Sequence, residues 1–360
     1  MVRLLVNVIV CLALAGSLSS CLVGRFAWYN FSNITDYKIF PSRAIPAATE
    51  PFRFKQPVKQ PNQSGVRFLD SVNNANNSVA FLIIRNDTLL YERYFQGYQD
   101  ASVVASFSMA KSYTSALVGA ALADGLIKSV DEPITNYLPE LRSRRGFSEI
   151  KIRHLLQMTS GIKGSESYYN PVGQAAKLYY GQNLRRYLKK LTIADPPGTH
   201  FEYRSVNTQL LGLIVERVSG KSLTEYLDNR IWRHLQPEYE ASWSIDRKND
   251  GVEKAFCCIN ARARDFAKFG RLYLHDGDWN GTPVLPREWV RESTRSSREE
   301  GAVSYYKYQW WLTDKGFSAI GHLGQYVYVN RAKNLIIVRL GEKEGKVSWE
   351  RLFDELVDKL

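Results

Sequence analysis

The spacing of hydrophobic residues changes several times along this chain, and each change predicts a different element of secondary structure. Residues 79–84 and 89–95 are rich in β-branched and aromatic side chains, and Asn86-Asp87 between them is a hairpin turn signal. From residue 108 onward, apolar residues recur at helical spacing until Gly125. This part of the chain therefore predicts a β-hairpin followed by a mostly apolar, buried helix.

The C-terminal part of the chain repeats both patterns. Residues 201–220 predict an apolar helix just after Tyr203, and residues 325–340 predict two strands joined by a turn at 330–334. The last segment predicts a helix with one apolar face, as expected for a helix that covers a sheet. That face contains Trp349, Leu352, Phe353, Leu356 and Leu360. Strand patterns thus lie toward both chain ends, and helical patterns dominate residues 108–235.

The N-terminus has the pattern of a signal peptide over residues 1–20. A basic start precedes an apolar run that is too short for a comfortable transmembrane span, and Leu18-Ser19-Ser20-Cys21 resembles a bacterial lipobox. We therefore predict a lipoprotein of the bacterial cell envelope, anchored in the membrane through acylated Cys21. A periplasmic or secreted protein after ordinary cleavage, or an uncleaved membrane anchor, is the alternative. Prolines spread over 41–61 predict an extended tether over 21–65.

Composition and charge narrow the class of protein. Of 360 residues, 44% are hydrophobic and 12% aromatic, which is enough for a sizeable core. The formal net charge is +12, but Lys and Arg are scattered and no nucleic-acid-binding motif is present, so we expect no nucleic-acid partner. The charge instead favours attraction to an anionic membrane or cell-wall surface.

Cysteines and histidines predict no metal site. Cys257 and Cys258 are adjacent, and a disulfide between neighbouring residues is strained, so we expect two buried thiols that pack like small apolar side chains. No spacing of Cys and His resembles a zinc site, and no glycine-rich phosphate loop is present. We therefore expect neither a metal nor a cofactor.

Ser108 and Lys111 are the strongest candidates for chemistry. A serine and a lysine at this spacing share a helix face, with their polar heads close enough to hydrogen-bond. The lysine can serve as the base for a hydroxyl nucleophile if burial or a nearby cation lowers its pKa. The same spacing recurs at Ser148 and Ser304. Ser148 is better explained as the cap of an amphipathic helix, and Ser304 has no clear helix start around it.

Two further motifs follow Ser108-Met109-Ala110-Lys111 in order. Tyr203 precedes the second apolar helix, and His322-Leu323-Gly324 leads into the C-terminal hairpin. With these motifs the chain resembles the serine β-lactamase and penicillin-binding family over most of residues 66–345. Within it, the similarity is to the branch of class C β-lactamases, esterases and 6-aminohexanoate-dimer hydrolases. The connecting stretches 128–141, 152–162 and 260–281 match this branch as well.

The resemblance implies an α+β fold of the β-lactamase/transpeptidase-like type. In this fold an antiparallel sheet is flanked by helices, beside a mostly helical subdomain. The implied serine hydrolase domain covers residues 66–360, with the helical insert at about 120–260. The active site would lie between the sheet and the helical part, where the three motifs meet.

The resemblance also implies a role for each motif residue. Ser108 would be the nucleophile, Lys111 its base and Tyr203 a proton relay to the leaving group. The oxyanion would lie between the backbone N–H groups of Ser108 and Gln325, the residue after Gly324.

Two positions depart from the family pattern. Ser205 stands where asparagine is usual, and His322 replaces a lysine whose permanent charge helps β-lactamases hold the drug's carboxylate. His322 could donate a hydrogen bond to Tyr203 or to the substrate.

Tyr168 and Tyr169 either line the pocket or are exposed loop aromatics.

We therefore expect a serine hydrolase that acts on a small ester or amide. One alternative is a β-lactamase or a cell-wall D,D-peptidase-like enzyme, and Ser205 and His322 argue against it. A second alternative is a non-catalytic surface protein that keeps the fold for binding. The presence of Ser108, Lys111 and Tyr203 together argues against that alternative.

Overall fold

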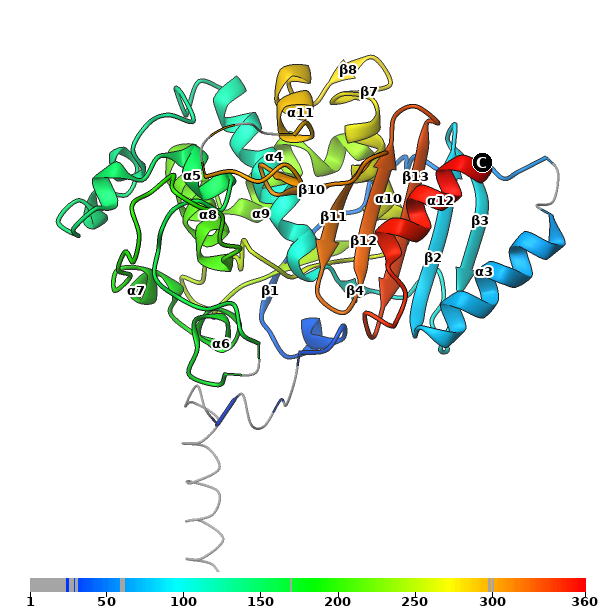
Figure 1. The fold of residues 1–360 in the computed structure, drawn as a ribbon, viewed down its shortest axis with the longest axis horizontal. Coiled ribbons are helices and arrows are strands. Elements are labelled where there is room, and N and C mark those ends of the chain that lie inside the picture. Colours follow the sequence, from blue (N-terminus) through cyan, green and yellow to red (C-terminus); the bar gives the residue numbers. More distant parts are fainter. Residues whose placement is uncertain are drawn as a thin grey trace, which may run out of the picture.

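A seven-stranded antiparallel sheet, built from both ends of the chain, forms the right-hand half of the molecule in Figure 1. The computed structural model describes residues 24–25, 29, 32–58, 62–168, 170–296, 299 and 301–360. The strand order is β3-β2-β13-β12-β11-β10-β9. These strands are β2 (Ser78–Arg85), β3 (Thr88–Tyr94), β9 (Tyr306–Lys307), β10 (Trp310–Leu312), β11 (Phe317–Gly321), β12 (Gln325–Asn330) and β13 (Leu335–Gly341).

Both predicted hairpins are confirmed. β2 and β3 are joined by Asn86 and Asp87, whose φ angles of 50° and 58° match a turn with two left-handed residues. β12 and β13 pair from Asn330 opposite Leu335. Every residue of β12 and β13 is buried, because helices cover both faces of the sheet at this point.

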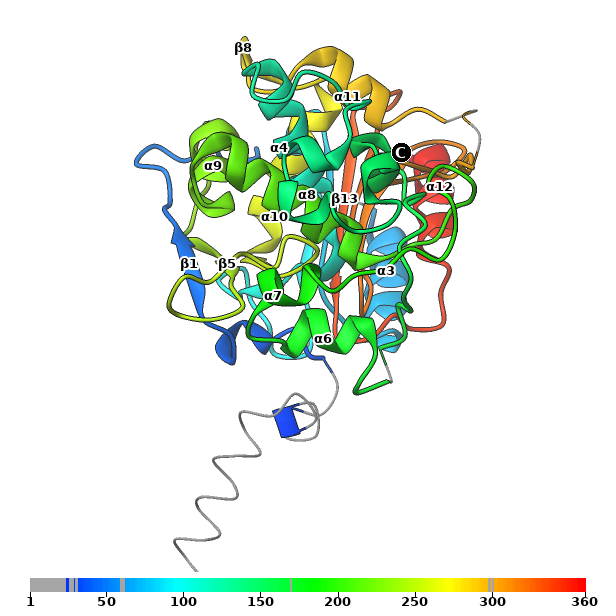
Figure 2. The ribbon, with the colours of Figure 1, turned by 90° about the vertical axis from the view of Figure 1, so that its left-hand side faces the viewer.

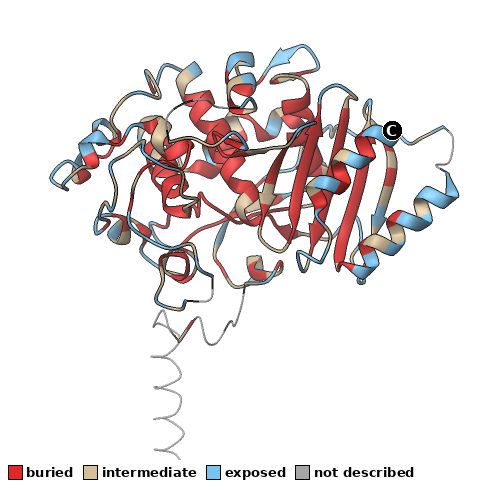
Figure 3. Ribbon diagram, in the orientation of Figure 1, coloured by how far each residue is buried: buried red, intermediate tan, exposed pale blue. Residues whose placement is uncertain are grey.

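Helices α3 (Gln63–Ala75) and α12 (Trp349–Lys359) cover the outer face of the sheet (Figure 1). The predicted apolar face of the last helix is confirmed, since Trp349 and Phe353 are fully buried against sheet residues such as Phe81. Helix α10 (Ala263–Leu274) packs on the opposite face, against β12 and β13. Figure 3 shows exposed residues along the outward side of α12 and along most of α3, whose first three residues are all exposed.

The remaining helices lie mainly between β4 and β9 in the chain and form the left-hand half of Figure 1. The longest are α4 (Ala110–Ala123) and α8 (Ser205–Ser219), which pack against each other and are largely buried. The others are α5 (Ile152–Leu156), α6 (Gln174–Tyr180), α7 (Leu184–Leu188), α9 (Leu223–Arg230) and α11 (Arg287–Ser293). Short 3₁₀ turns are η1 (Asp36–Lys38), η2 (Phe107–Met109), η3 (Ile134–Asn136), η4 (Pro139–Leu141), η5 (Phe147–Glu149) and η6 (Trp232–Leu235).

The expectation of an extended tether over 21–65 is wrong for its described part. Residues 42–45 form a strand that pairs antiparallel with residues 241–244 in a second sheet (Figure 2). Ile45 and Phe54 are buried, so apolar side chains between the prolines hold this stretch on the domain. The second sheet has the order β1-β5-β6-β4. Its strands are β1 (Ser42–Ile45), β4 (Val104–Ala105), β5 (Ala241–Ser244) and β6 (Ile259–Ala261), and a separate pair is β7 (Asp278–Trp279) with β8 (Thr282–Pro283).

Ser148 does not cap the helix that follows it. It lies in η5, and α5 begins only at Ile152, with Lys151 as its N-cap residue. The backbone N–H of Lys151 donates to the Nδ1 atom of His154 at 3.2 Å. Lys151 thus holds the N-cap position that the sequence suggested for the serine, and His154, the third residue of α5, accepts its backbone N–H.

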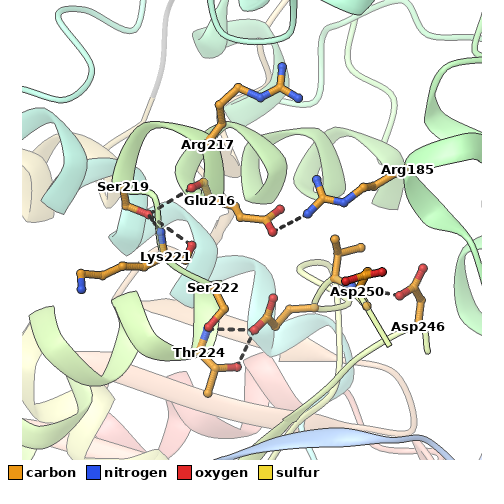
Figure 4. Close-up of polar contacts among 12 residues, drawn as sticks. Arg185, Glu216, Arg217, Ser219, Lys221, Ser222, Thr224, Asp246 and Asp250 are labelled. Carbon is orange, nitrogen blue, oxygen red and sulfur yellow. Dashed lines mark hydrogen bonds and ion pairs between the residues drawn. The ribbon is translucent and has the colours of Figure 1, made fainter. Parts of the chain in front are cut away.

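A polar network ties the turn between α8 and α9 to its neighbours (Figure 4). Glu216 of α8 pairs with Arg185 of α7. The buried carboxylate of Glu253 accepts hydrogen bonds from the N–H and hydroxyl of Thr224 at the start of α9, at 3.1 and 2.8 Å. Glu253 also pairs with Arg43 of β1 at 2.7 Å. It thereby anchors the stretch that follows it, which forms a wall of the candidate active site.

Within the described part of the chain, no helix has both the length and the apolar character that a bilayer crossing requires. The predicted signal peptide, and the predicted acylation site Cys21, fall outside the described residues.

Candidate active site

Ser108 sits on a tight turn between the second sheet and the buried helix α4. Ser106, two residues earlier, is bonded to β6: its N–H donates to the carbonyl of Ile259 at 2.8 Å, and the N–H of Ile259 donates to its hydroxyl at 3.0 Å. Phe107 has a φ of 44°, a left-handed value uncommon for a large side chain. The turn leaves Ser108 partly exposed while the next residues are buried. The predicted helix therefore starts with one 3₁₀ turn rather than directly at Ser108.

Lys111 lies one turn further along and is almost completely buried. Its Nζ atom donates hydrogen bonds to Ser108 Oγ at 2.8 Å, Ser205 Oγ at 3.0 Å and the carbonyl of Phe256 at 3.1 Å. Burial lowers the pKa of Lys111 to about 8, and the nearby carboxylate of Glu166 opposes this shift. At this pKa roughly one Lys111 side chain in ten is unprotonated at pH 7, far more than for an ordinary lysine.

Two tyrosines lie within hydrogen-bonding reach of the Ser108 hydroxyl. Tyr203 precedes α8, and Tyr168 lies in the loop between α5 and α6. The Lys111 ammonium is 4.9 Å from the centre of the Tyr203 ring. Burial raises the pKa of both phenols above the ordinary value, so both keep their protons at neutral pH. Tyr169, the other predicted aromatic, lies outside the described residues.

Ser205 and Glu166 extend the hydrogen bonds from Lys111 toward the pocket. The N–H of Ser205 donates to Glu166 Oε2 at 2.9 Å, and the Ser205 hydroxyl donates to Glu166 Oε1. Sequence reasoning missed Glu166, because the loop that carries it has neither a motif nor a helical pattern. The Glu-x-Tyr spacing with Tyr168 was the only local signal.

His322 follows β11 and lies at the same pocket, but its contacts differ from the expected ones. Its ring stacks on Tyr168 with centroids 4.8 Å apart, and meets the edge of Phe107 at 5.6 Å. Burial lowers the pKa of His322 below its ordinary value. The imidazole is therefore neutral at pH 7 and supplies no fixed positive charge.

The turn after His322 is held by a buried arginine that the sequence did not single out. Leu323 and Gly324 have φ angles of 64° and 80°, and a Cβ atom at Gly324 would lie 1.9 Å from Arg339 Nη1. Arg339 donates to the carbonyl of Gly324 at 2.6 Å. The side chain of Gln325 is bonded to His322 and to β13, so only its backbone N–H remains for the predicted oxyanion role.

The stretch before β6 forms the opposite wall and contains a disulfide between neighbours. Cys257 and Cys258 are both buried, as expected, but they are bonded to each other. The expectation of two free thiols is therefore wrong. Cys258 has a φ of 72°, a backbone conformation that brings the adjacent sulfurs together. Phe256, directly before this pair, supplies the carbonyl that binds Lys111.

These groups surround a cavity of about 270 Å³. Its wall is mostly apolar and aromatic, and Glu166 and His322 are the residues on it with acidic or imidazole side chains. No lysine or arginine lines it among the described residues. The apolar wall includes Phe107, Tyr179, Tyr180, Phe256 and Leu323.

The other two Ser-x-x-Lys matches are placed differently. Lys307 is paired with Glu292 and Glu299 at 3.1 Å each, and Ser304 is exposed. Lys151 is an exposed helix cap that lies 3.7 Å from Asp131. Lys307 is buried, but it is paired with carboxylates, and Lys151 is exposed, so neither match repeats the surroundings of Lys111.

One group of ligand-type side chains in the described part of the chain is close enough to hold a metal ion. Asp195, His200 and Glu202 have ligand atoms within 4.8 Å of one another. They lie away from the pocket wall, and the Glu202 carboxylate already accepts two hydrogen bonds from Arg204 at 2.6 and 3.0 Å. We assign this group no role in the chemistry.

Comparison with known proteins agrees with this geometry. The Beta-lactamase family model matches residues 70–357. The 6-aminohexanoate-dimer hydrolase of Paenarthrobacter ureafaciens is 30% identical over 284 residues, which cover 72% of this chain and 71% of that protein.

Solved structures show the same fold. A Bacillus anthracis protein described as a candidate 6-aminohexanoate-dimer hydrolase has a TM-score of 0.80 at 24% identity, covering 91% of this chain and 94% of that one. A class C β-lactamase has a TM-score of 0.59 at 16% identity, covering 80% and 91%. The predicted α+β, β-lactamase/transpeptidase-like fold is confirmed. The chain belongs to the β-lactamase family, and it is a serine hydrolase.

Proposed function

We propose that this protein hydrolyses small esters or amides through an acyl-enzyme formed on Ser108. The observation that carries the proposal is the buried Lys111 amine, 2.8 Å from Ser108 Oγ, with its pKa lowered to about 8. A serine hydroxyl is a weak nucleophile until a base accepts its proton, and a neutral lysine at this distance can do so.

The first step transfers one acyl group. Lys111 Nζ takes the proton of Ser108 as Oγ bonds to the carbonyl carbon of the substrate. The bond from that carbon to the leaving oxygen or nitrogen then breaks, and Tyr203 donates a proton to the leaving group. The raised pKa of Tyr203 suits this role, because the phenol still carries its proton at neutral pH. Lys111 then carries the serine proton and Tyr203 has lost its own. In the second step Tyr203 takes a proton from water as the water oxygen bonds to the carbonyl carbon. The bond from that carbon to Ser108 Oγ breaks, Lys111 returns a proton to Oγ, and the carboxylic acid leaves.

The negative oxygen of the tetrahedral intermediate would bind between the backbone N–H groups of Ser108 and Gln325. Two features support this placement. The end of β11 lies against the nucleophile turn, so closely that a Cβ atom at Gly321 would be 2.2 Å from the carbonyl of Ser106. Arg339 holds the following turn in place. One such donor typically contributes ~3 to 4 kcal/mol to transition-state stabilisation.

The cavity favours an acyl group that is apolar and carries no negative charge. Its wall is mostly aromatic and aliphatic, and its titratable groups are a carboxylate and a neutral imidazole. A substrate carboxylate would meet Glu166 and would find no lysine or arginine among the described lining residues. Tyr168 and His322 are placed to contact the substrate at the cavity wall.

Replacing the nucleophile tests this proposal. Ser108→Ala should abolish both the hydrolysis of p-nitrophenyl butyrate and covalent labelling by a fluorophosphonate, because the other hydroxyl bonded to Lys111, that of Ser205, already donates its proton to Glu166. Ser148→Ala and Ser304→Ala are matched controls with the same sequence spacing, because Lys151 is exposed and the buried Lys307 is paired with Glu292 and Glu299. Should either control lose labelling while Ser108→Ala keeps it, the nucleophile is assigned to the wrong residue.

We further propose that the enzyme works at the bacterial cell envelope, attached to the membrane through a lipid on Cys21. The lipobox-like sequence before Cys21 and the high positive charge of the chain support this location.

A further inference from the structure

Glu166 contacts the serine that contacts Lys111, and these contacts allow only one direction of hydrogen bonding. The N–H of Ser205 donates to Glu166 Oε2 at 2.9 Å, and its hydroxyl donates to Glu166 Oε1. A hydroxyl has a single proton, and an ionised carboxylate has none to give back. With its proton directed at Glu166, Ser205 Oγ can act only as an acceptor toward Lys111.

The second polar partner of Lys111 is also an acceptor. The carbonyl of Phe256 lies 3.1 Å from Nζ and has no proton to donate. A neutral amine has two N–H bonds and one lone pair. If the two N–H bonds point to Phe256 and to Ser205 at 3.0 Å, the lone pair points to the third partner, Ser108 Oγ, at 2.8 Å. This is the orientation in which the amine can accept the proton of the nucleophile.

We infer that Glu166 is a positioning residue that directs the lone pair of Lys111 at Ser108 by fixing the hydroxyl of Ser205. Without Glu166, the Ser205 hydroxyl can rotate and donate to that lone pair, in competition with Ser108. The inference rests on the proposed function, because it assigns Glu166 a part in the reaction of Ser108 with Lys111.

The charge of Glu166 has a second effect, on the protonation of Lys111. Burial lowers the pKa of Lys111 to about 8, and the carboxylate opposes that shift. Several phenols and one imidazole also face the site. The phenols are Tyr168, from the same loop, Tyr179 and Tyr180 of α6, Tyr187 of α7, Tyr203, before α8, and Tyr306 of β9, and the imidazole is His322, after β11. Burial raises the pKa of each phenol and lowers that of the imidazole, so these groups are neutral at pH 7. Removing the negative charge at position 166 therefore lowers the pKa of Lys111.

Glu166→Gln separates this role from simple helix capping. The two Ser205 donors go to different carboxylate oxygens, and Gln replaces one of these oxygens with an NH2 group that cannot accept. One donor therefore loses its acceptor, and kcat for p-nitrophenyl butyrate should fall about 10- to 100-fold, as expected for a misplaced catalytic group. In the wild type, kcat/KM should rise with pH through about 8 as Lys111 loses its proton. In the variant, the midpoint of this rise, which is the acid limb of the pH profile, should lie about one pH unit lower, because Lys111 has lost a nearby opposite charge.

The outcome that overturns the inference is equally specific. Ser205 is the first residue of α8, so Glu166 also caps a helix N-terminus. A role confined to capping would lower the melting temperature of Glu166→Gln while leaving kcat and the position of the acid limb unchanged.

Two further variants separate charge from geometry. Glu166→Asp keeps the charge but shortens the side chain, so kcat should fall while the acid limb stays at its wild-type position. In a Ser205→Ala background, Glu166→Gln should reduce kcat by less than about twofold further, because the contact through which it acts is already gone. If the two losses multiply instead, Glu166 does not act through Ser205.

Glu149→Gln is the matched control, because Glu149 is exposed on η5 and far from the cavity wall; it should behave as wild type. Fluorophosphonate labelling distinguishes a failure of the proposed function from a failure of the role assigned to Glu166. Wild-type protein that is not labelled on Ser108 contradicts the proposed function itself. Labelled wild-type protein with an unchanged Glu166→Gln profile overturns only the role of Glu166.

Discussion

At the scale of single residues, the choice of substrate depends on which side chains are charged at neutral pH. Lys111 has its pKa lowered to about 8 by burial, and His322 has its pKa lowered as well. The cavity therefore combines an amine that can act as a base with an imidazole that carries no charge. Glu166 is the residue with a carboxylate among the described residues that line the cavity, and its charge would repel anionic ligands.

This charge pattern predicts a preference against β-lactams. Purified mature protein should cleave p-nitrophenyl butyrate with a kcat/KM at least about 100-fold above that for benzylpenicillin or a cephalosporin, because their carboxylates meet no cation at His322. The measurement is a spectrophotometric comparison at pH 7.5. An equal or higher value for the β-lactams would contradict the proposed substrate class and support the β-lactamase alternative.

The catalytic residues should behave as one unit. Lys111→Ala and Tyr203→Phe should each fold normally but lose about 100-fold or more in kcat, the share typical of general acid–base help. The double variant should lose little more than either single one, because the two groups assist the same proton transfers. Steady-state kinetics together with circular dichroism checks both statements. Losses that multiply would mean that the two residues act in separate steps.

At the scale of elements, the turn between β11 and β12 depends on a residue from β13. Arg339 is fully buried and donates to the carbonyls of Gly324, Asn76 and Lys343 at 2.6 to 2.9 Å. Its guanidinium also lies 4.0 Å from the centre of the Trp349 ring in α12. One side chain thus joins the outer helix, the sheet and the turn that carries Gln325.

Arg339→Met should therefore weaken both the fold and the reaction. Each buried carbonyl left without a donor costs ~1–3 kcal/mol, so the free energy of unfolding should fall by about 3 kcal/mol or more. Urea denaturation measures the loss, and kcat should fall with it as the backbone N–H of Gln325 moves.

Arg351→Met provides the control for this prediction. Arg351 is 82% exposed and pairs only with its helix neighbour Glu355 among its described partners, so its loss should change stability by less than about 0.5 kcal/mol. Equal effects of the two substitutions would show that burial of Arg339 does not stabilise the turn.

At the scale of the whole molecule, the N-terminal part of the domain reaches the active site. Ser32 lines the cavity, and Asp36 accepts a hydrogen bond at 2.7 Å from Tyr179, which also lines it. The proposed lipid anchor, Cys21, is 11 residues before Ser32, so it would keep the cavity within roughly 40 Å of the membrane surface.

Lipid attachment predicts a labelling difference at Cys21. A clickable palmitate analogue should label wild-type protein in growing cells and should not label Cys21→Ser, because the thiol at this position is the proposed acceptor. Wild-type protein should also sediment with membranes. Equal labelling of the two proteins, or a wild type found only in the soluble fraction, would contradict the lipoprotein proposal.

The sequence by itself determined the elements whose pattern is local. The hairpin at Asn86-Asp87 and the helix containing Ser108 and Lys111 follow from side chains only a few positions apart, where periodicity and turn preference act directly. The pairing of Ser108 with Lys111 belongs to the same class, since one helical turn brings the two side chains together wherever the helix lies.

Only the tertiary structure determines which residues from distant parts of the sequence contact one another at the site. Ser205 and Glu166 are 39 positions apart, and Lys111 and Phe256 are 145 apart, so no periodicity connects them. The sequence of residues 42–45 likewise predicts a tether, and they form a strand because β5 provides hydrogen-bond partners for their backbone. The physical reason is that a buried polar group needs a partner but does not specify where in the chain it comes from. The packing of α4 against α8 brings Lys111 to Ser205, and Glu166, from a loop that lines the same cavity, meets Ser205 there.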